Sequence, residues 1–77
     1  MRDLLEYLVR EIVDDPDAVE VDERTDERGV LFSLRVAQED MGKVIGRHGR
    51  TARSIRTVMK AAAIRAGVHH VHVEIVD

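Results

Sequence analysis

The feature that most restricts the fold is the stretch 30–36, in which side chains alternate in character. Every second position is apolar, and these positions are Val30, Phe32, Leu34 and Val36. Successive side chains of a β-strand project to opposite faces, so the pattern predicts a strand with one buried face. A single strand cannot bury that face alone, so the chain must also supply partner strands and a covering layer.

A second strand is predicted just before this one, at residues 18–24. Val19 and Val21 alternate with acidic residues there, and a polar turn over residues 25–29 ends on a glycine. Glycine commonly closes such turns. We expect an antiparallel hairpin in which Val19 and Val21 lie on the Phe32 side of the sheet.

A third strand is predicted near the C-terminus, where apolar and polar residues alternate again. The apolar positions are Val71, Val73 and Ile75, and the polar ones are His70, His72 and Glu74. Two helical patterns separate this strand from the strand at 30–36. Crossovers between parallel strands are right-handed, and this preference places the last strand parallel to strand 30–36 in a mixed sheet.

Three stretches carry apolar residues at helical spacing. The first covers residues 2–13 and ends before Pro16, which cannot continue a helix. A short helix opens at Glu39 and Asp40, where acidic side chains suit the helix dipole, and a long one covers residues 50–66. Their apolar positions are Leu4, Leu5, Leu8, Val9 and Ile12, then Met41, Val44 and Ile45, then Ala52, Ile55, Val58, Met59, Ala62 and Ala63.

The predicted order is therefore helix, strand, strand, helix, helix, strand. We expect an α+β fold in which helices cover one face of a three-stranded mixed sheet. Residues 1–77 are enough for one small domain. A chain of this length has marginal stability alone, so self-association would help it.

Charge is distributed unevenly, although the net charge is only −3. Residues 1–40 hold five basic and thirteen acidic side chains, a net −8, whereas residues 41–77 hold seven basic and two acidic ones, a net +5. A local basic surface can bind a polyanion whatever the global pI is. A solvated helix surface is the ordinary alternative for the basic stripe on the long helix, which is formed by Arg50, Arg53, Arg56 and Lys60.

Gly46 and Gly49 enclose Arg47 and His48 between the short helix and the long one. Glycine permits a sharp turn and the close approach of another backbone. A helix that begins after such a turn points unpaired N–H groups and the positive end of its dipole at the turn. The stretch is therefore a candidate site for phosphate, and an ordinary turn between two helices is the alternative.

The stretch Val44-Ile45-Gly46-Arg47-His48-Gly49, followed by Ile55 in the next helix, resembles the GXXG signature of KH domains. The predicted element order resembles the type II, prokaryotic KH arrangement. The short length and the runs Ile55-Arg56-Thr57-Val58 and Ala61-Ala62-Ala63 are similar to the KhpA family of small bacterial single-KH proteins. The resemblance covers essentially the whole chain.

This resemblance implies binding of single-stranded RNA, with about four nucleotides held by the loop and an adjoining groove. It assigns phosphate contacts to the loop and to the start of the long helix, and base contacts to an apolar groove wall. The phosphate residues are Gly46, Arg47, His48, Gly49, Arg50 and Arg53, with Lys43 as a weaker candidate, and the wall residues are Val44, Ile45 and Ala52. Arg56 and Lys60 stay open between RNA contact and solvated surface.

Two features of the sequence bear on base preference. Family members often carry an apolar residue where this chain has Thr51, which predicts a more polar groove floor. Only Tyr7 and Phe32 are aromatic, and Phe32 is expected in the core, so bases should not stack on aromatic rings. We expect weak, salt-dependent binding. Single-stranded DNA is a further candidate, because the clamp itself does not depend on a 2′-OH.

The family also implies a homodimer, and pairing with a larger KH protein of the KhpB or EloR type. It favours a role as an RNA chaperone or post-transcriptional regulator. In some bacteria such a pair is linked to control of cell elongation and division, so a dimerisation module with secondary RNA contact is the competing hypothesis. Ile64 is the candidate contact, because it is an apolar residue on the basic side of its helix, and Tyr7 is another. Simple surface exposure is the alternative for both.

Nothing in the sequence predicts catalysis, a cofactor or a metal centre. The chain has no Cys and no convincing nucleophile with a base. His70 and His72 share a strand face, but a metal would need a third ligand such as Glu74, so exposed strand residues are the simpler interpretation. No apolar run has membrane length, and nothing in the sequence resembles a signal peptide. We expect a cytoplasmic protein without a membrane partner.

Overall fold

The computed structural model describes residues 1–77 and contains a three-stranded sheet in the order β1-β2-β3. The strands are β1 (Glu20–Asp26), β2 (Gly29–Arg35) and β3 (Val71–Ile75). β1 pairs antiparallel with β2, and β3 pairs parallel with β2. The expected mixed sheet is therefore confirmed, including the direction of its last strand.

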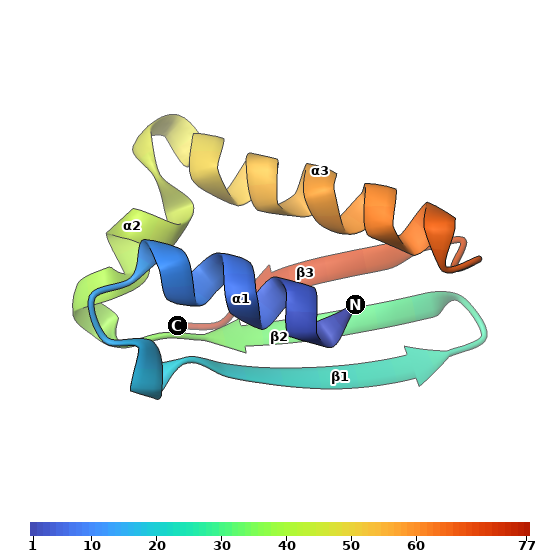
Figure 1. The fold of residues 1–77 in the computed structure, drawn as a ribbon, viewed down its shortest axis with the longest axis horizontal. Coiled ribbons are helices and arrows are strands. Elements are labelled where there is room, and N and C mark those ends of the chain that lie inside the picture. Colours follow the sequence, from blue (N-terminus) through green and yellow to red (C-terminus); the bar gives the residue numbers. More distant parts are fainter.

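Three α-helices accompany the sheet: α1 (Arg2–Ile12), α2 (Met41–Ile45) and α3 (Arg50–Arg65). α1 and α3 run in opposite directions over the same side of the sheet, and α2 lies at one end, beside the start of α3 (Figure 1). The other side of the sheet is not covered, since register-paired Asp22, Ser33 and Glu74 carry exposed or half-exposed side chains there. This is the expected α+β arrangement. None of the helices has the length and apolar character that a membrane-spanning helix needs.

The core lies between the helices and the sheet. Phe32 and Leu34 of β2 are fully buried, as are Leu5 and Val9 of α1 and Met59 of α3. Burying a side chain of this size contributes about 1.5–3 kcal/mol relative to leaving it exposed. The apolar alternation of the strands and the apolar stripes of the helices thus meet in one cluster, as their periodicities require.

The hairpin is tighter than the sequence predicts. β1 begins at Glu20 rather than at residue 18 and continues to Asp26, so only Glu27 and Arg28 form the turn. One carboxylate oxygen of Asp26 accepts hydrogen bonds from the amides of Arg28, at 2.8 Å, and of Gly29, at 3.1 Å. This local bonding closes the turn early and extends both strands. The residues before β1 form a single 3₁₀ turn, Pro16–Ala18.

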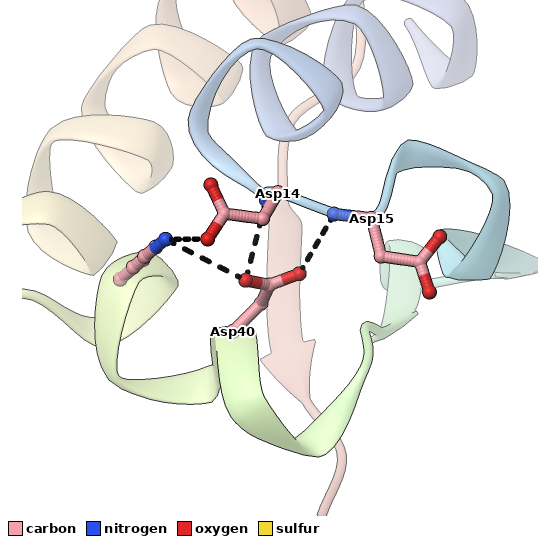
Figure 2. Close-up of polar contacts among 4 residues, drawn as sticks. Asp14, Asp15 and Asp40 are labelled. Carbon is pink, nitrogen blue, oxygen red and sulfur yellow. Dashed lines mark hydrogen bonds and ion pairs between the residues drawn. The ribbon is translucent and has the colours of Figure 1, made fainter.

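Asp40 is the one buried charged residue of the protein, with only 2 % of its surface exposed. Its two carboxylate oxygens accept hydrogen bonds from the amides of Asp14, at 3.2 Å, and Asp15, at 3.1 Å (Figure 2). The ammonium of Lys43 completes the cluster through an ion pair with Asp14 and lies 3.9 Å from an Asp40 oxygen. As the sequence predicts, Asp40 stands at the start of α2, where it is the N-cap residue, but its side chain caps no amide of that helix. It ties the segment after α1 to the start of α2 instead.

Candidate nucleic-acid interface

A four-residue loop joins α2 to α3. α2 ends at Ile45, and residues 47–49 form a single 3₁₀ turn before α3 begins at Arg50. Gly46 and Gly49 have φ values of +76° and +73°, which suit glycine and few other residues. The carbonyl of Gly46 accepts a hydrogen bond from the amide of Gly49 at 3.1 Å and closes the turn.

The two glycines are required for different reasons. A Cβ added to Gly46 would lie 2.2 Å from Oγ1 of Thr51 and 2.7 Å from its backbone nitrogen, so no side chain fits there. A Cβ on Gly49 would meet nothing within 4 Å, so only its positive φ favours glycine. Thr51 is half-buried and packs against Gly46. It is not part of the groove lining, so the prediction that it makes the groove floor more polar is wrong.

Arg47 and His48, between the glycines, are both exposed. His48 has a φ of +58°, the left-handed conformation, which costs a non-glycine residue roughly 1–2 kcal/mol. The surrounding helices and the Gly46–Gly49 hydrogen bond hold this conformation. The result is a sharp turn whose two basic-type side chains project from the protein rather than into it.

The first turn of α3 begins immediately after this loop. Its N-cap is Gly49, which has no side chain to cap the first amides. The positive end of the helix dipole therefore faces the loop. Arg50 and Arg53 are exposed in this region, and every ion pair of the protein lies elsewhere, at Glu6 with Arg2 and Arg10 and at Lys43 with Asp14 and Asp40. The positive charge beside the loop is not neutralised by the protein itself.

A groove of about 570 Å³ starts at the loop and runs between α3 and β3. This volume is within the range that proteins use to hold small organic groups. Ile45 provides an apolar wall and is 40 % exposed, while Ala52 forms part of the floor. The full lining is Ile45, Gly49, Ala52, Arg56, His72, Val73, Glu74 and Ile75. A groove with an apolar wall and several polar lining residues thus adjoins an exposed basic turn.

Comparison with known proteins identifies the family. The sequence profile described as "KhpA/KhpB, KH domain" matches residues 2–75. The chain is 54% identical to the RNA-binding protein KhpA of Clostridium acetobutylicum over 65 residues, which are 84% of this chain and 87% of the relative. It is 48% identical over 77 residues to RNA-binding protein KhpA of Streptomyces coelicolor, covering all of this chain and 92% of the relative. It is 42% identical over the whole length of both chains to RNA-binding protein KhpA of Halalkalibacterium halodurans.

The chain belongs to the KhpA/KhpB KH-domain family. The resemblance seen in the stretch 44–49 and in the element order is therefore confirmed. These KhpA relatives come from bacteria and are named as RNA-binding proteins.

Two residues that the KhpA resemblance assigned to RNA do not have the expected surroundings. Val44 has no exposed surface and belongs to the core, so its side chain cannot touch a base, and that assignment is wrong. Its neighbour Ile45 takes the wall position. The ammonium of Lys43 is bound by Asp14, which raises its pKa, with a smaller contribution from Asp40. Lys43 is already paired with carboxylates on the side of α2 that faces the chain after α1.

Sequence reasoning missed most of the β3 side of the groove and left Arg56 undecided. The guanidinium Nε of Arg56 donates a hydrogen bond to the backbone carbonyl of Val73 at 3.2 Å, so this side chain spans from α3 to β3. A signal was present, because Arg56 follows the groove residue Ala52 by four positions, and residues four apart lie on one helix face. The β3 residues carried no such signal, because only the fold brings them beside α3.

The two candidate contact residues are both on the surface. Ile64 of α3 is 77% exposed and Tyr7 of α1 is 62% exposed. Val58, which the sequence predicts on the apolar side of α3, lies at the margin of that side and is 41% exposed. No group of three His, Cys, Asp or Glu side chains is placed to hold a metal ion.

Proposed function

We propose that this KhpA/KhpB-family protein binds single-stranded RNA in the cytoplasm, without catalysis, as an RNA chaperone or post-transcriptional regulator. The observation that carries the proposal is the position of the Gly46–Gly49 loop at the mouth of a groove that is lined by both apolar and polar residues. Phosphates would contact the loop amides and the side chains of Arg47 and His48, with Arg50 and Arg53 next along α3. Bases would pack against Ile45 and Ala52. The names of the relatives support RNA as the ligand.

The clamp explains how a protein with net charge −3 can bind a polyanion. The acidic residues are concentrated in residues 1–40, whereas the loop and α3 contain none. A strand that approaches the loop therefore meets unpaired positive charge, and the acidic part of the surface disfavours other orientations. Affinity should rest mainly on phosphate contacts and should fall as salt rises.

The direct test replaces Arg47 and His48 with Asp. Both side chains are exposed, so the fold should be retained, while two negative charges occupy the place proposed for phosphate. We expect affinity for a fluorescein-labelled oligouridine, measured by anisotropy, to fall roughly tenfold or more. The matched control makes the same changes at two exposed residues, Arg28 in the turn between β1 and β2 and His69 between α3 and β3. Both of these connections lie at the opposite end of the molecule from the loop (Figure 1).

The outcomes of this test are distinct. An unchanged affinity in the loop variant, or an equal loss in the control variant, would contradict the proposed clamp. A DNA oligonucleotide of equivalent sequence, measured in parallel, shows whether the 2′-OH contributes to binding. Equal affinities for the two polymers would extend the proposal to single-stranded DNA.

We also propose that Ile64 contacts a second protein chain, either another copy or a larger KH protein of the KhpB or EloR type. The supporting observation is that this large apolar side chain is 77% exposed near the C-terminal end of α3, one turn after Lys60. Tyr7 is a weaker candidate, because charged residues of α1 surround it. Under this alternative, partner binding in control of cell elongation or division is the main role and RNA contact is secondary.

Light scattering of the wild-type protein and of Ile64→Asp tests this second proposal. We expect a dimer that becomes a monomer in the variant, with secondary structure unchanged by circular dichroism. Equal masses of the two proteins, in isolation and when mixed with the larger KH protein, would remove Ile64 from the interface. Retained RNA affinity in a monomeric Ile64→Asp would show that the loop and Ile64 act separately.

A further inference from the structure

Arg56 links the two sides of the groove. Its guanidinium Nε donates to the carbonyl of Val73 at 3.2 Å. β3 lies at the edge of the sheet and has a neighbouring strand, β2, on one side only. The bond therefore fixes the arginine against the open edge of β3, inside the groove lining and away from the loop.

Arg56 is also the principal cation of the groove. The lining contains one other basic-type residue, His72, and one acidic residue, Glu74. Both flank Val73, whose side chain is buried toward the helices. Because successive side chains of a strand alternate between faces, those of His72 and Glu74 project toward the uncovered side of the sheet. Arg56 is thus the charged side chain that faces a base bound between α3 and β3.

The free donors of Arg56 decide which base fits. Arginine has five N–H donors and no acceptor, and only Nε is engaged by Val73. The two terminal nitrogens remain as a planar fork that matches two adjacent acceptor atoms. Guanine offers O6 and N7, and cytosine offers O2 and N3. Adenine places its N6 amino group beside N7, and uracil places an N–H between its two oxygens. Each of these bases would therefore put a hydrogen-bond donor opposite a donor of the guanidinium.

We propose that Arg56 reads one base of the bound strand and selects a nucleotide with two adjacent hydrogen-bond acceptors, guanine or cytosine, over adenine and uracil. This inference rests on the proposed RNA-binding function and specifies the ligand of the same groove. It assigns different tasks to neighbouring arginines. Arg53 is exposed and outside the groove lining, so it contributes charge without reading a base.

The test uses four fluorescein-labelled octaribonucleotides that are oligouridine except for one central position, which is U, A, C or G. Affinities are measured by anisotropy at one salt concentration, since comparison across salt concentrations is meaningless. We expect wild-type protein to bind the C or the G oligonucleotide roughly 5- to 10-fold more tightly than the U and A ones, the lower part of what one arginine–base pair contributes. Whether C or G is preferred identifies which pair of acceptors is read.

Arg56→Lys keeps the charge but loses the planar fork. This variant should bind all four oligonucleotides with similar affinity, close to that of wild-type protein for oligouridine. Arg65→Lys, at the exposed end of α3 and outside the groove lining, is the matched control and should keep the wild-type preference. Thermal unfolding of both variants checks that the fold is retained.

The possible failures are distinguishable. Binding of all four oligonucleotides by wild-type protein without preference would overturn the role of Arg56 and leave the clamp intact. A base preference that persists in Arg56→Lys would also overturn the role of Arg56 and leave the clamp intact. A preference of the wild-type protein for adenine or uracil would have the same consequence. If wild-type protein bound none of the four, the proposed function would fail and this inference with it.

Discussion

Replacing Gly46 with Ala gives the sharpest test of the loop geometry. The backbone of Gly46 has φ +76° and ψ 170°, a combination that is essentially restricted to glycine. Holding another residue there costs about 1–3 kcal/mol. The added methyl group would also lie 2.2 Å from Oγ1 and 2.7 Å from the backbone nitrogen of Thr51, so the start of α3 must move. Forcing a group into a filled space costs a further ~1–3 kcal/mol.

The two costs together give about 2–6 kcal/mol for Gly46→Ala. At 0.05–0.15 kcal/mol per residue, a chain of 77 residues has a free energy of unfolding of roughly 4–12 kcal/mol. The substitution would therefore remove a large part of the stability. Gly49→Ala is the control, because its φ is +73° but the space around it is open. Only the conformational cost of roughly 1–2 kcal/mol applies there.

Urea unfolding followed by circular dichroism measures both variants against the wild-type protein. We expect Gly46→Ala to lose at least ~1 kcal/mol more than Gly49→Ala. Adding Thr51→Ala to Gly46→Ala should recover part of the loss, since the Oγ1 contact disappears while the backbone contact remains. If the two glycine variants were equally stable, or if Thr51→Ala gave no recovery, the argument from close packing at Gly46 would be refuted.

Two further predictions concern the cluster around Asp40. Asp40→Ala should lower the free energy of unfolding by about 2–4 kcal/mol, because the amides of Asp14 and Asp15 lose their acceptor. Asp40→Asn should lose less stability in the same urea titration. Equal stability of the wild-type protein and both variants would contradict this role of Asp40. The hydrogen bond to Asp14 raises the pKa of Lys43 in the folded state. The stabilising contribution of Lys43 should therefore be constant up to about pH 10 and be lost as pH rises through the folded-state pKa. The free energies of unfolding of wild-type protein and Lys43→Met, measured by urea titration, should become more similar as the pH rises above about 10. A stability difference that grows with pH would contradict this direction of the pKa shift.

The order of elements was predictable because strands and long helices leave periodic patterns. The alternation at 30–36 and the spacing in α1 and α3 each repeat several times, so the pattern is unambiguous. α2 has only five residues. One turn of helix contains too few positions to show which of two adjacent apolar residues, Val44 or Ile45, faces the core. The tertiary packing decides this, and it buries Val44.

Long-range polar contacts were the other limit of prediction. Asp40 bonds to amides 25 and 26 residues away, and no local pattern reports such a pairing. The same holds for the bond from Arg56 to Val73, because the backbone carbonyl of a strand carries no sequence signature. The loop was predictable for the opposite reason. Its glycines, basic residues and flanking helices are contiguous in the sequence, so one stretch contains all the groups that the phosphate site needs.

The sheet is small and has two open edges, which bears on how the protein behaves at high concentration. Unpaired edge strands can join the edges of other molecules and start aggregation. β1 counters this with charge, since five of its seven residues are charged: Glu20, Asp22, Glu23, Arg24 and Asp26. β3 is shorter and more apolar, and the guanidinium of Arg56 occupies one of its carbonyls. The same arginine that faces the groove therefore also removes one acceptor from this edge, so variants at this position should be compared at low protein concentration.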